Sequence, residues 1–130
     1  CDLARPEGRT VLIEPLNAVS APEYFLENTF QAADIIQTLG RKELRLMFDC
    51  FHVQMTEGNL THRLNDLFPL IGHIQFAAAP MRGTPDQGEV NFAHVFEHID
   101  RLGWTQPLGA EYLPEGPTED RLGWMRDLQR

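Results

Sequence analysis

The feature that most restricts the fold of this chain is a strand pattern followed by a helix pattern, repeated four times. Each short apolar or β-branched run precedes a longer segment with apolar residues at helical spacing, and the runs begin roughly 30 residues apart. The predicted strands are residues 10–13, 44–48, 73–77 and 107–110. Because each connecting helix returns the chain to the same end of the sheet, this alternation predicts an α/β fold with parallel strands.

The predicted helices follow these strands, over residues 20–40, 59–71, 91–103 and 118–128. Ser20 and Glu23 have the spacing of a capping box, which predicts the start of the first helix. Pro69 is expected to end or tighten the last turn of the second helix. Asn91 is expected to cap the third helix, and acidic residues in the first turn favour the fourth.

The length of the chain favours half of a barrel. A TIM (β/α)8 barrel has about 250 residues, or roughly 31 for each βα unit, so 130 residues hold about four units. We therefore predict one partial barrel domain over residues 1–130. A flavodoxin-like open sheet is the alternative with the same pattern. Because the chain begins with Cys rather than Met, we expect it to be part of a longer protein.

The composition excludes several classes of protein. The chain is 42% hydrophobic and 23% charged, as in globular proteins, and its net charge is -8. This charge disfavours nucleic-acid binding, which needs clustered Lys and Arg. There is no apolar run of roughly 20 residues, so we expect no membrane partner. Two isolated cysteines and the lack of a signal-peptide pattern favour a reducing, cytoplasmic location.

Each predicted strand ends at one side chain with a metal-binding oxygen. These residues are Glu14, Asp49, Gln75 and Glu111. The carboxyl ends of parallel strands share one face, and on a barrel they point toward a common centre. A single acid in this position usually caps a helix or contacts solvent, but four in succession make coincidence a weaker explanation. Clustered carboxylates repel unless a cation lies among them, so we predict a divalent metal, Mg²⁺ or Mn²⁺ rather than Zn²⁺.

Two basic residues near the strand ends each allow two interpretations. His52 is either a loop histidine bonded to backbone or a residue that faces the ligand. Arg82 is either a solvated arginine or a clamp for a substrate carboxylate. A third feature, His94-Val-Phe-Glu-His98, matches a zinc-protease motif. The helical phase turns both of its histidines toward solvent, which disfavours a protease.

Six runs of the chain form one recognisable series: residues 12–17, 49–54, 58–61, 72–75, 88–92 and 109–114. Together they resemble the hydroxypyruvate isomerase family of the xylose-isomerase-like barrels. The resemblance covers essentially the whole chain in collinear order. It corresponds to the C-terminal half of such a barrel, so the partner expected for the chain is either its missing N-terminal half or a second copy.

The resemblance implies an isomerase that interconverts hydroxypyruvate and tartronate semialdehyde (2-hydroxy-3-oxopropanoate), or a close 2-oxo acid. The implied reaction is metal-assisted proton transfer through an enediolate, without a nucleotide cofactor. A sugar epimerase, a 2-oxo-tetronate isomerase and a non-catalytic truncated half-barrel remain alternatives. An abasic-site endonuclease is disfavoured by the acidic charge and by the few histidines at strand ends.

The resemblance also implies roles for individual residues. Glu14 and Glu111 match the catalytic acid–base pair, and both also match metal positions together with Asp49 and Gln75. Related epimerases carry His where Gln75 stands, which places this sequence on the isomerase side. Two residues match the positions that contact the 2-oxo or 2-hydroxy acid substrate: His52 and Arg82.

Overall fold

A single parallel sheet runs through the computed structural model, which describes residues 1–127. Its strands are β1 (Val11–Ile13), β2 (Leu44–Asp49), β3 (Ile71–Phe76) and β4 (Leu108–Ala110). They lie in the sheet in the order β1-β2-β3-β4, and each neighbouring pair is parallel. The predicted α/β fold with parallel strands is confirmed, with strand bounds that shift by one or two residues.

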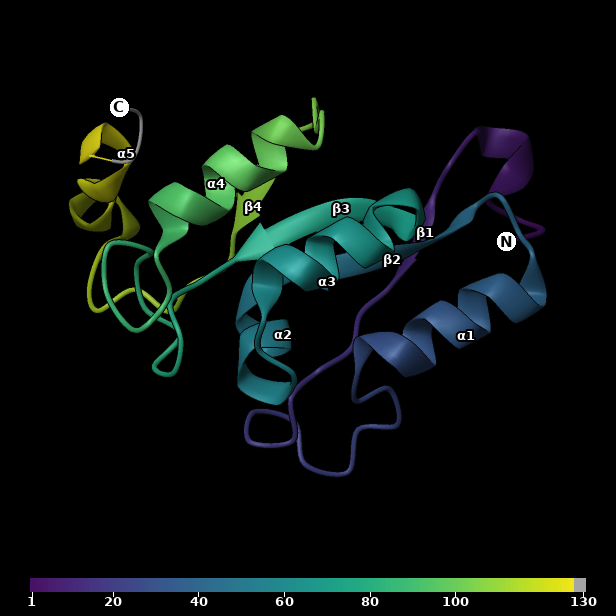
Figure 1. Cartoon of the computed structure of the whole chain (residues 1–130), viewed down its shortest axis with the longest axis horizontal. Coiled ribbons are helices and arrows are strands. Elements are labelled where there is room, and N and C mark those ends of the chain that lie inside the picture. Colours follow the sequence, from purple (N-terminus) through teal and green to yellow (C-terminus); the bar gives the residue numbers. More distant parts are fainter. Residues whose placement is uncertain (128–130) are drawn as a thin grey trace.

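The strand order decides between the two predicted architectures. In a flavodoxin-like sheet the order reverses at a switch point, so strands that are consecutive in sequence are not all neighbours. Here each strand lies beside the next one in the sequence. Helices α1 (Thr29–Leu39), α3 (Leu60–Leu67) and α4 (Phe92–Arg101) also follow one another in chain order (Figure 1). This is the winding of four consecutive units of a (β/α)8 barrel.

The hydrophobic core lies between these helices and one face of the sheet. Leu46 and Phe48 of β2 are fully buried, and they belong to one cluster with Ile36 of α1, Leu64 of α3 and Ile99 of α4. The alternation of buried and half-buried residues along β2 directs every second side chain into this core. Full burial stabilises each such side chain by about 1.5 to 3 kcal/mol.

The opposite face of the sheet carries half-buried residues. Arg45 and Met47 alternate with the core residues of β2 and lie on this face. Gly72 is required there, because a Cβ at this position would lie 2.7 Å from Cδ2 of Leu12 and would also meet Arg45. Gly109 similarly faces His73, whose Nε2 would lie 2.9 Å from a Cβ. This face corresponds to the barrel interior.

The first helix begins later than the capping box predicts. α1 starts after Asn28, whose side chain accepts a hydrogen bond of 2.9 Å from the backbone N–H of Gln31. The capping-box prediction at Ser20 is therefore wrong. Glu23 has a φ of 65°, which no α-helix contains, and the backbone N–H of Ser20 is bonded to the side chain of Asn17 instead.

The helix predicted over 91–103 is confirmed as α4, which Asn91 caps by accepting a hydrogen bond from the N–H of His94. Two other helical predictions need correction. The predicted helix 59–71 ends at Leu67, because Pro69 lies in a 3-10 turn, η2 (Phe68–Leu70), and β3 follows at once. The predicted helix 118–128 divides into η3 (Thr118–Arg121) and α5 (Trp124–Asp127), and residue 128 lies outside the described residues. A further 3-10 turn, η1 (Arg5–Glu7), precedes the sheet.

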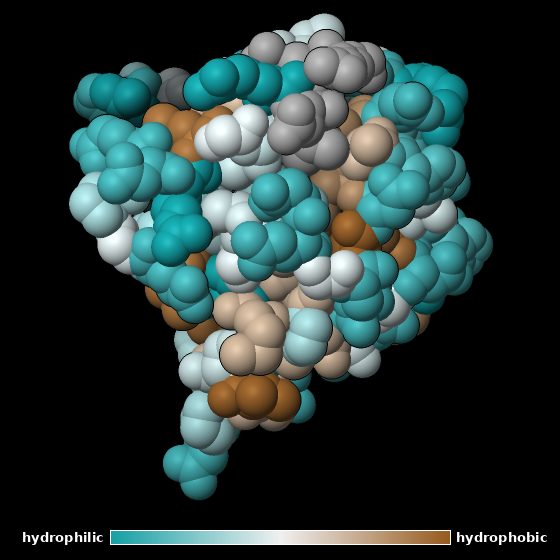
Figure 2. Space-filling view, turned by 90° about the vertical axis from the view of Figure 1, so that its left-hand side faces the viewer, coloured by the Kyte–Doolittle hydropathy of each residue, from teal (hydrophilic) through white to brown (hydrophobic). Residues whose placement is uncertain are grey.

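The surface that carries the loop after β3 and the C-terminal helices is largely hydrophilic. Figure 2 shows hydrophobic side chains on this side as separate patches among hydrophilic ones. Within residues 1–127, none of the helices has the length and apolar content that crossing a membrane requires.

Candidate active site

The carboxyl end of β2 forms the centre of the site. Asp49 ends the strand and also caps α2 (Cys50–Thr56), a helix that the sequence patterns did not predict. Its Oδ1 accepts a 2.8 Å hydrogen bond from the backbone N–H of Phe51. Its Oδ2 is buried without a hydrogen-bond partner and lies 3.8 Å from Nε2 of His52. Because α2 begins at the strand end, it holds His52 one turn from Asp49.

The strand register brings the predicted residues of the next strands beside Asp49. Asp49 pairs with Gln75 on β3, and Gln75 pairs with Gly109 on β4. Oε1 of Gln75 is buried and has no hydrogen-bond partner. Glu111 follows β4 directly, and its backbone N–H donates to the carbonyl oxygen of Phe76 at 3.0 Å. The predicted alignment of strand-end side chains is thus present on β2, β3 and β4.

Glu14 joins the site from β1. Its Oε1 is also buried without a partner. Glu14, Asp49 and His52 each offer one ligand atom, and these atoms lie within 4.8 Å of one another. Together with the free oxygen of Gln75, the site contains three buried, unpaired oxygen atoms from three neighbouring strands. Such oxygens are costly unless a cation or donor satisfies them, so the residues fit a divalent metal ion.

The electrostatics of the two buried carboxylates support this interpretation. The pKa of Glu14 is raised to about 7, mainly by burial and also by the negative charges of Asp49 and Glu111, against the opposing effect of Arg82. Burial likewise raises the pKa of Asp49 to about 6, although the N–H of Phe51 and the charge of Arg82 act in the opposite direction. The protein alone therefore leaves these two charges undercompensated.

Arg82 is the positive group of the site. Its Nη2 donates to Oε2 of Glu111 at 2.9 Å and lies 3.8 Å from Oδ2 of Asp49. Its guanidinium group lies 5.1 Å from the ring centroid of Phe51. The side chain of Glu111 is 49% exposed, so Glu111 forms the solvent side of the site and holds Arg82.

A tight turn aims Arg82 at the strand ends. Arg82 has a φ of 54°, in the left-handed region that few residues other than glycine adopt. The turn is closed by a 2.9 Å hydrogen bond from the N–H of Ala78 to the carbonyl oxygen of Gly83. Gly88 lies against this turn, and any side chain there would collide with the carbonyl oxygen of Ala79. The loop conformation thus depends on residues that hydrophobic periodicity does not reveal.

A cavity of about 240 Å³ opens beside these groups. Its lining residues are Glu14, Leu16, Ser20, Ala21, His52, Arg82 and Glu111. Four predicted site residues therefore line one cavity, with Asp49 and Gln75 beside them. Sequence reasoning missed Asn17 and Phe51, which contact His52 and Arg82 respectively. Both belong to runs that carry the family resemblance, although those runs assigned them no role.

Comparison with known proteins identifies the family of this barrel. Residues 1–128 match the family described as Xylose isomerase-like TIM barrel. The chain belongs to this family. The crystal structure described as AP endonuclease, family 2, from Brucella melitensis superposes with a TM-score of 0.93 and 33% identity, over 97% of this chain and 49% of that one.

Two curated relatives bear isomerase names. The 2-oxo-tetronate isomerase of Pectobacterium atrosepticum is 40% identical over 123 residues, which are 95% of this chain and 47% of the relative. The hydroxypyruvate isomerase of Escherichia coli is 37% identical over 119 residues, which are 92% of this chain and 46% of the relative. The chain thus spans about half the length of the curated relatives it matches.

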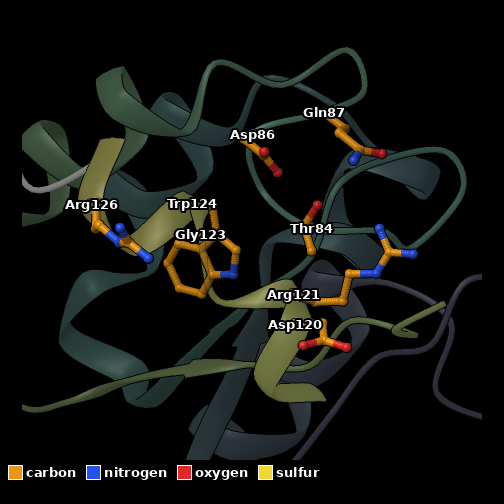
Figure 3. A pocket seen from close by; sticks show the side chains of 8 residues that line it. All are labelled: Thr84, Asp86, Gln87, Asp120, Arg121, Gly123, Trp124 and Arg126. Atoms are coloured by element: carbon orange, nitrogen blue, oxygen red, sulfur yellow. The ribbon is translucent and has the colours of Figure 1, made fainter. Parts of the chain in front are cut away.

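A second hollow of this xylose isomerase-like chain lies away from the strand-end carboxylates. It has a volume of about 430 Å³ and separates the loop after β3 from the C-terminal helices (Figure 3). The residues that line it are Thr84, Asp86, Gln87, Asp120, Arg121, Gly123, Trp124 and Arg126. None of the predicted site residues lines it, and its two acids offset its two arginines. We therefore place the site in the smaller cavity, where buried unpaired oxygens lie.

The zinc-protease motif of α4 does not form a second metal site within residues 1–127. The rings of His94 and His98 stack at a centroid distance of 6.5 Å, and His94 is exposed as predicted. His98 is half-buried and its Nε2 is buried without a hydrogen-bond partner, so the predicted exposure of His98 is wrong. Among residues 1–127, the group of three metal-ligating side chains consists of Glu14, Asp49 and His52, and neither motif histidine belongs to it.

Proposed function

We propose that this chain carries the active site of an isomerase that moves a hydrogen between adjacent carbons of a small 2-oxo acid. Hydroxypyruvate, converted to tartronate semialdehyde (2-hydroxy-3-oxopropanoate), is the proposed substrate. The observation that carries this proposal is the group of buried, unpaired oxygens of Glu14, Asp49 and Gln75 at neighbouring strand ends. The names of the relatives support the same class of reaction.

The proposed cofactor is a divalent metal ion, Mg²⁺ or Mn²⁺. The oxygen atoms of Glu14, Asp49 and Gln75 would hold it, with Glu111 completing the four predicted metal positions. Oxygen-rich donor sets suit these hard cations. When bound, the metal polarises the substrate carbonyl and stabilises the charge that develops on substrate oxygens.

Proton transfer is assigned jointly to Glu14 and Glu111. Both line the cavity, one from β1 and the other after β4. One glutamate removes the carbon-bound proton, and it or its partner returns a proton to the adjacent carbon. In the metal-free protein the pKa of the Glu14 carboxyl group is raised to about 7, mainly because burial disfavours its charged form.

Arg82 is proposed to bind the carboxylate group of the substrate. Its planar guanidinium can match a carboxylate through paired hydrogen bonds, and its Nη2 already donates one hydrogen bond to the Glu111 carboxylate at 2.9 Å. A substrate carboxylate would compete with Glu111 for Arg82. Substrate binding would then free Glu111 for proton transfer.

2-Oxo-tetronate is the second candidate substrate. The relative named for this activity is 40% identical to the chain, which is comparable to the 37% of the hydroxypyruvate isomerase. Identity therefore does not separate the two acids. Rates measured with both acids, on the same metal-loaded intact protein, decide between them.

Hydrogen exchange tests the proposal directly. The intact protein with Mn²⁺ should incorporate deuterium from D₂O into the carbon-bound position of hydroxypyruvate, faster than the protein-free solution. Glu111→Gln should abolish this exchange, because the amide cannot accept the proton. Glu115→Gln is the matched control, since the side chain of Glu115 is 93% exposed, and it should exchange like the wild type. Undiminished exchange in Glu111→Gln would refute the role of Glu111.

A lack of activity in the wild type has a separate meaning. If the folded, Mn²⁺-binding protein accelerates exchange with neither acid, the non-catalytic alternative is favoured over both isomerase activities.

A further inference from the structure

A buried hydrogen-bonded pair joins the loop after β1 to α2. Asn17 is 2% exposed and His52 is 3% exposed. The backbone N–H of Asn17 donates to Nδ1 of His52 at 3.0 Å, and the Nδ2 atom of the Asn17 side chain lies 2.7 Å from the same nitrogen. Two groups of one residue thus converge on a single ring nitrogen.

The orientation of the Asn17 amide follows from its other contact. The backbone N–H of Ser20 donates to Oδ1 of Asn17 at 2.9 Å. A backbone N–H can only donate, so the atom that faces Ser20 must be the amide oxygen and the atom that faces His52 must be the NH₂ group. Both groups that face Nδ1 of His52 are therefore donors, and Nδ1 must accept.

This contact determines where the proton of His52 lies. Because Nδ1 accepts a hydrogen bond from a backbone N–H, it carries no proton, and the ring is a neutral imidazole rather than an imidazolium. A neutral imidazole carries one proton, and with Nδ1 accepting it must reside on Nε2. Nε2 lies 3.8 Å from Oδ2 of Asp49, and His52 lines the same cavity as Glu14 and Glu111.

We propose that Asn17 is a positioning residue that locks His52 in the Nε2–H tautomer, so that His52 donates a hydrogen bond to a substrate oxygen. The donor role rests on the proposed isomerase function, whereas the tautomer lock stands on the contacts alone. A protonated Nε2 has no lone pair for a cation. His52 therefore lies outside the metal ligands, although Nε2 is close to the carboxylates, and the ligands are oxygens only.

The tautomer can be measured by NMR of the intact protein labelled with ¹⁵N-histidine. The His52 signals are assigned by their loss in His52→Gln. The ¹⁵N chemical shift of a ring nitrogen without a proton differs strongly from that of a protonated one. We expect an unprotonated Nδ1 in the wild type. In Asn17→Asp a carboxylate of the same size replaces the side-chain donor, so Nδ1 should acquire a proton and kcat should fall about 100- to 1,000-fold, as when one transition-state donor is lost.

Asn28→Asp provides the matched control. It makes the same chemical change in the same loop, and Asp caps helices as well as Asn does. Its His52 tautomer and kcat should equal those of the wild type. A protonated Nδ1 in the wild type would overturn the lock. An unchanged tautomer in folded Asn17→Asp would overturn the role of the Asn17 side chain, because the backbone N–H of residue 17 also faces Nδ1. If Asn17→Asp does not fold, the wild-type spectrum alone decides.

Metal binding gives a second readout that does not depend on activity. If His52 is a donor and not a ligand, His52→Gln should leave the Kd for Mn²⁺ within about threefold, whereas Asp49→Asn should raise it at least about tenfold. A tenfold loss of Mn²⁺ affinity in His52→Gln would show that His52 binds the metal, and would overturn the inference. Failure of the isomerase assay with an intact tautomer would count against the proposed function only.

Discussion

At the scale of single residues, Asp49 shows that a structural role and a functional role can occupy one side chain. One of its oxygens caps α2 through the N–H of Phe51, as a strand-end acid usually does. The other oxygen is buried without a partner. Stability alone would favour a side chain whose oxygens both accept hydrogen bonds, since a buried acceptor without a hydrogen bond is unfavourable by about 1 to 3 kcal/mol. Departures of this kind gather at functional sites.

The same reasoning predicts that removing the charge of Glu14 stabilises the metal-free protein. Glu14→Gln should raise the free energy of unfolding at pH 8 by about 1 to 2 kcal/mol in the presence of a chelator. This range is smaller than the full pKa shift of Glu14 would give, because Glu14 retains contact with solvent. The reason is that burial and two neighbouring carboxylates disfavour the charged form. Urea denaturation followed by circular dichroism measures the difference, and Glu119→Gln on the surface is the control.

The pH dependence of this difference has a definite sign. The pKa of Glu14 is raised in the folded state, from its ordinary value of 4.5 to about 7. The folded state therefore binds the proton more tightly than the unfolded state. The destabilisation caused by the charge of Glu14 is absent below about pH 4.5 and complete above about pH 7. The advantage of Glu14→Gln should vanish as the pH falls through this window. A variant that is less stable than the wild type at pH 8 would contradict the prediction.

At the scale of elements, α2 holds the loop after β1 at both ends. Near the loop start, Asn17 bonds to His52 in the first turn of α2. At the loop end, Glu57 at the C-cap of α2 accepts hydrogen bonds of 2.7 Å from the backbone N–H and from Oγ1 of Thr29. A seven-residue helix thus fixes a long loop that lines the site.

The clamp between Glu57 and Thr29 should contribute measurably to stability. The side chain of Glu57 is only 9% exposed, so Glu57→Ala leaves the first-turn N–H of α1 without its acceptor. We expect a loss of about 1.5 to 3 kcal/mol, and a smaller loss of about 0.5 to 1.5 kcal/mol for Thr29→Val, which removes one bond only. Thermal unfolding of both variants measures these losses.

A double-mutant cycle separates this clamp from general packing effects. The variant with both changes should lose less stability than the sum of the single variants, because each single change already removes the hydrogen bond from Oγ1 of Thr29 to Glu57. Glu27→Ala, at an exposed position of the same loop, should change stability by less than about 0.5 kcal/mol. Strict additivity of Glu57→Ala and Thr29→Val would show that the hydrogen bond from Oγ1 of Thr29 contributes nothing.

The elements also show which parts of the fold the sequence could predict. The strands were predictable because each combines an apolar run with a regular spacing to the next. The start of α1 was not, since Ser20 and Asn28 are both good caps and the contact of Ser20 with Asn17 decides between them. α2 was missed because its first four residues are all buried, so the run after Asp49 lacks the alternation of a surface helix.

The candidate site divides in the same way. Glu14, Asp49, Gln75 and Glu111 were predictable as a group, because parallel register aligns strand ends. The contact between Asn17 and His52 was not, because it joins residues 35 positions apart through a loop conformation that local patterns do not encode.

At the scale of the whole molecule, the two faces of the sheet differ. One face packs against α1, α3 and α4, and the other carries half-buried residues such as Leu12, Arg45 and Met47. Within residues 1–127, β1 and β4 each pair with one strand only. An unpaired strand edge offers backbone donors and acceptors to another chain, and half-exposed apolar residues favour the same contact. The unpaired edge of β1, together with the half-buried inner face beside it, is therefore suited to association with another chain.

We therefore expect the 130-residue chain on its own to self-associate in a concentration-dependent way. Sedimentation velocity over a range of concentrations measures the association constant. Leu12→Lys places a charge on the inner face beside the β1 edge and removes apolar contact, so the constant should fall about 10- to 100-fold, the equivalent of one leucine side chain. Leu3→Lys, at a leucine that is 92% exposed outside the sheet, makes the same change and should leave association unaltered. A wild-type chain that remains monomeric at every concentration would contradict this prediction. It would mean that the strand edges and the inner face find their contacts within one molecule, although β1 and β4 each pair with only one neighbouring strand within residues 1–127.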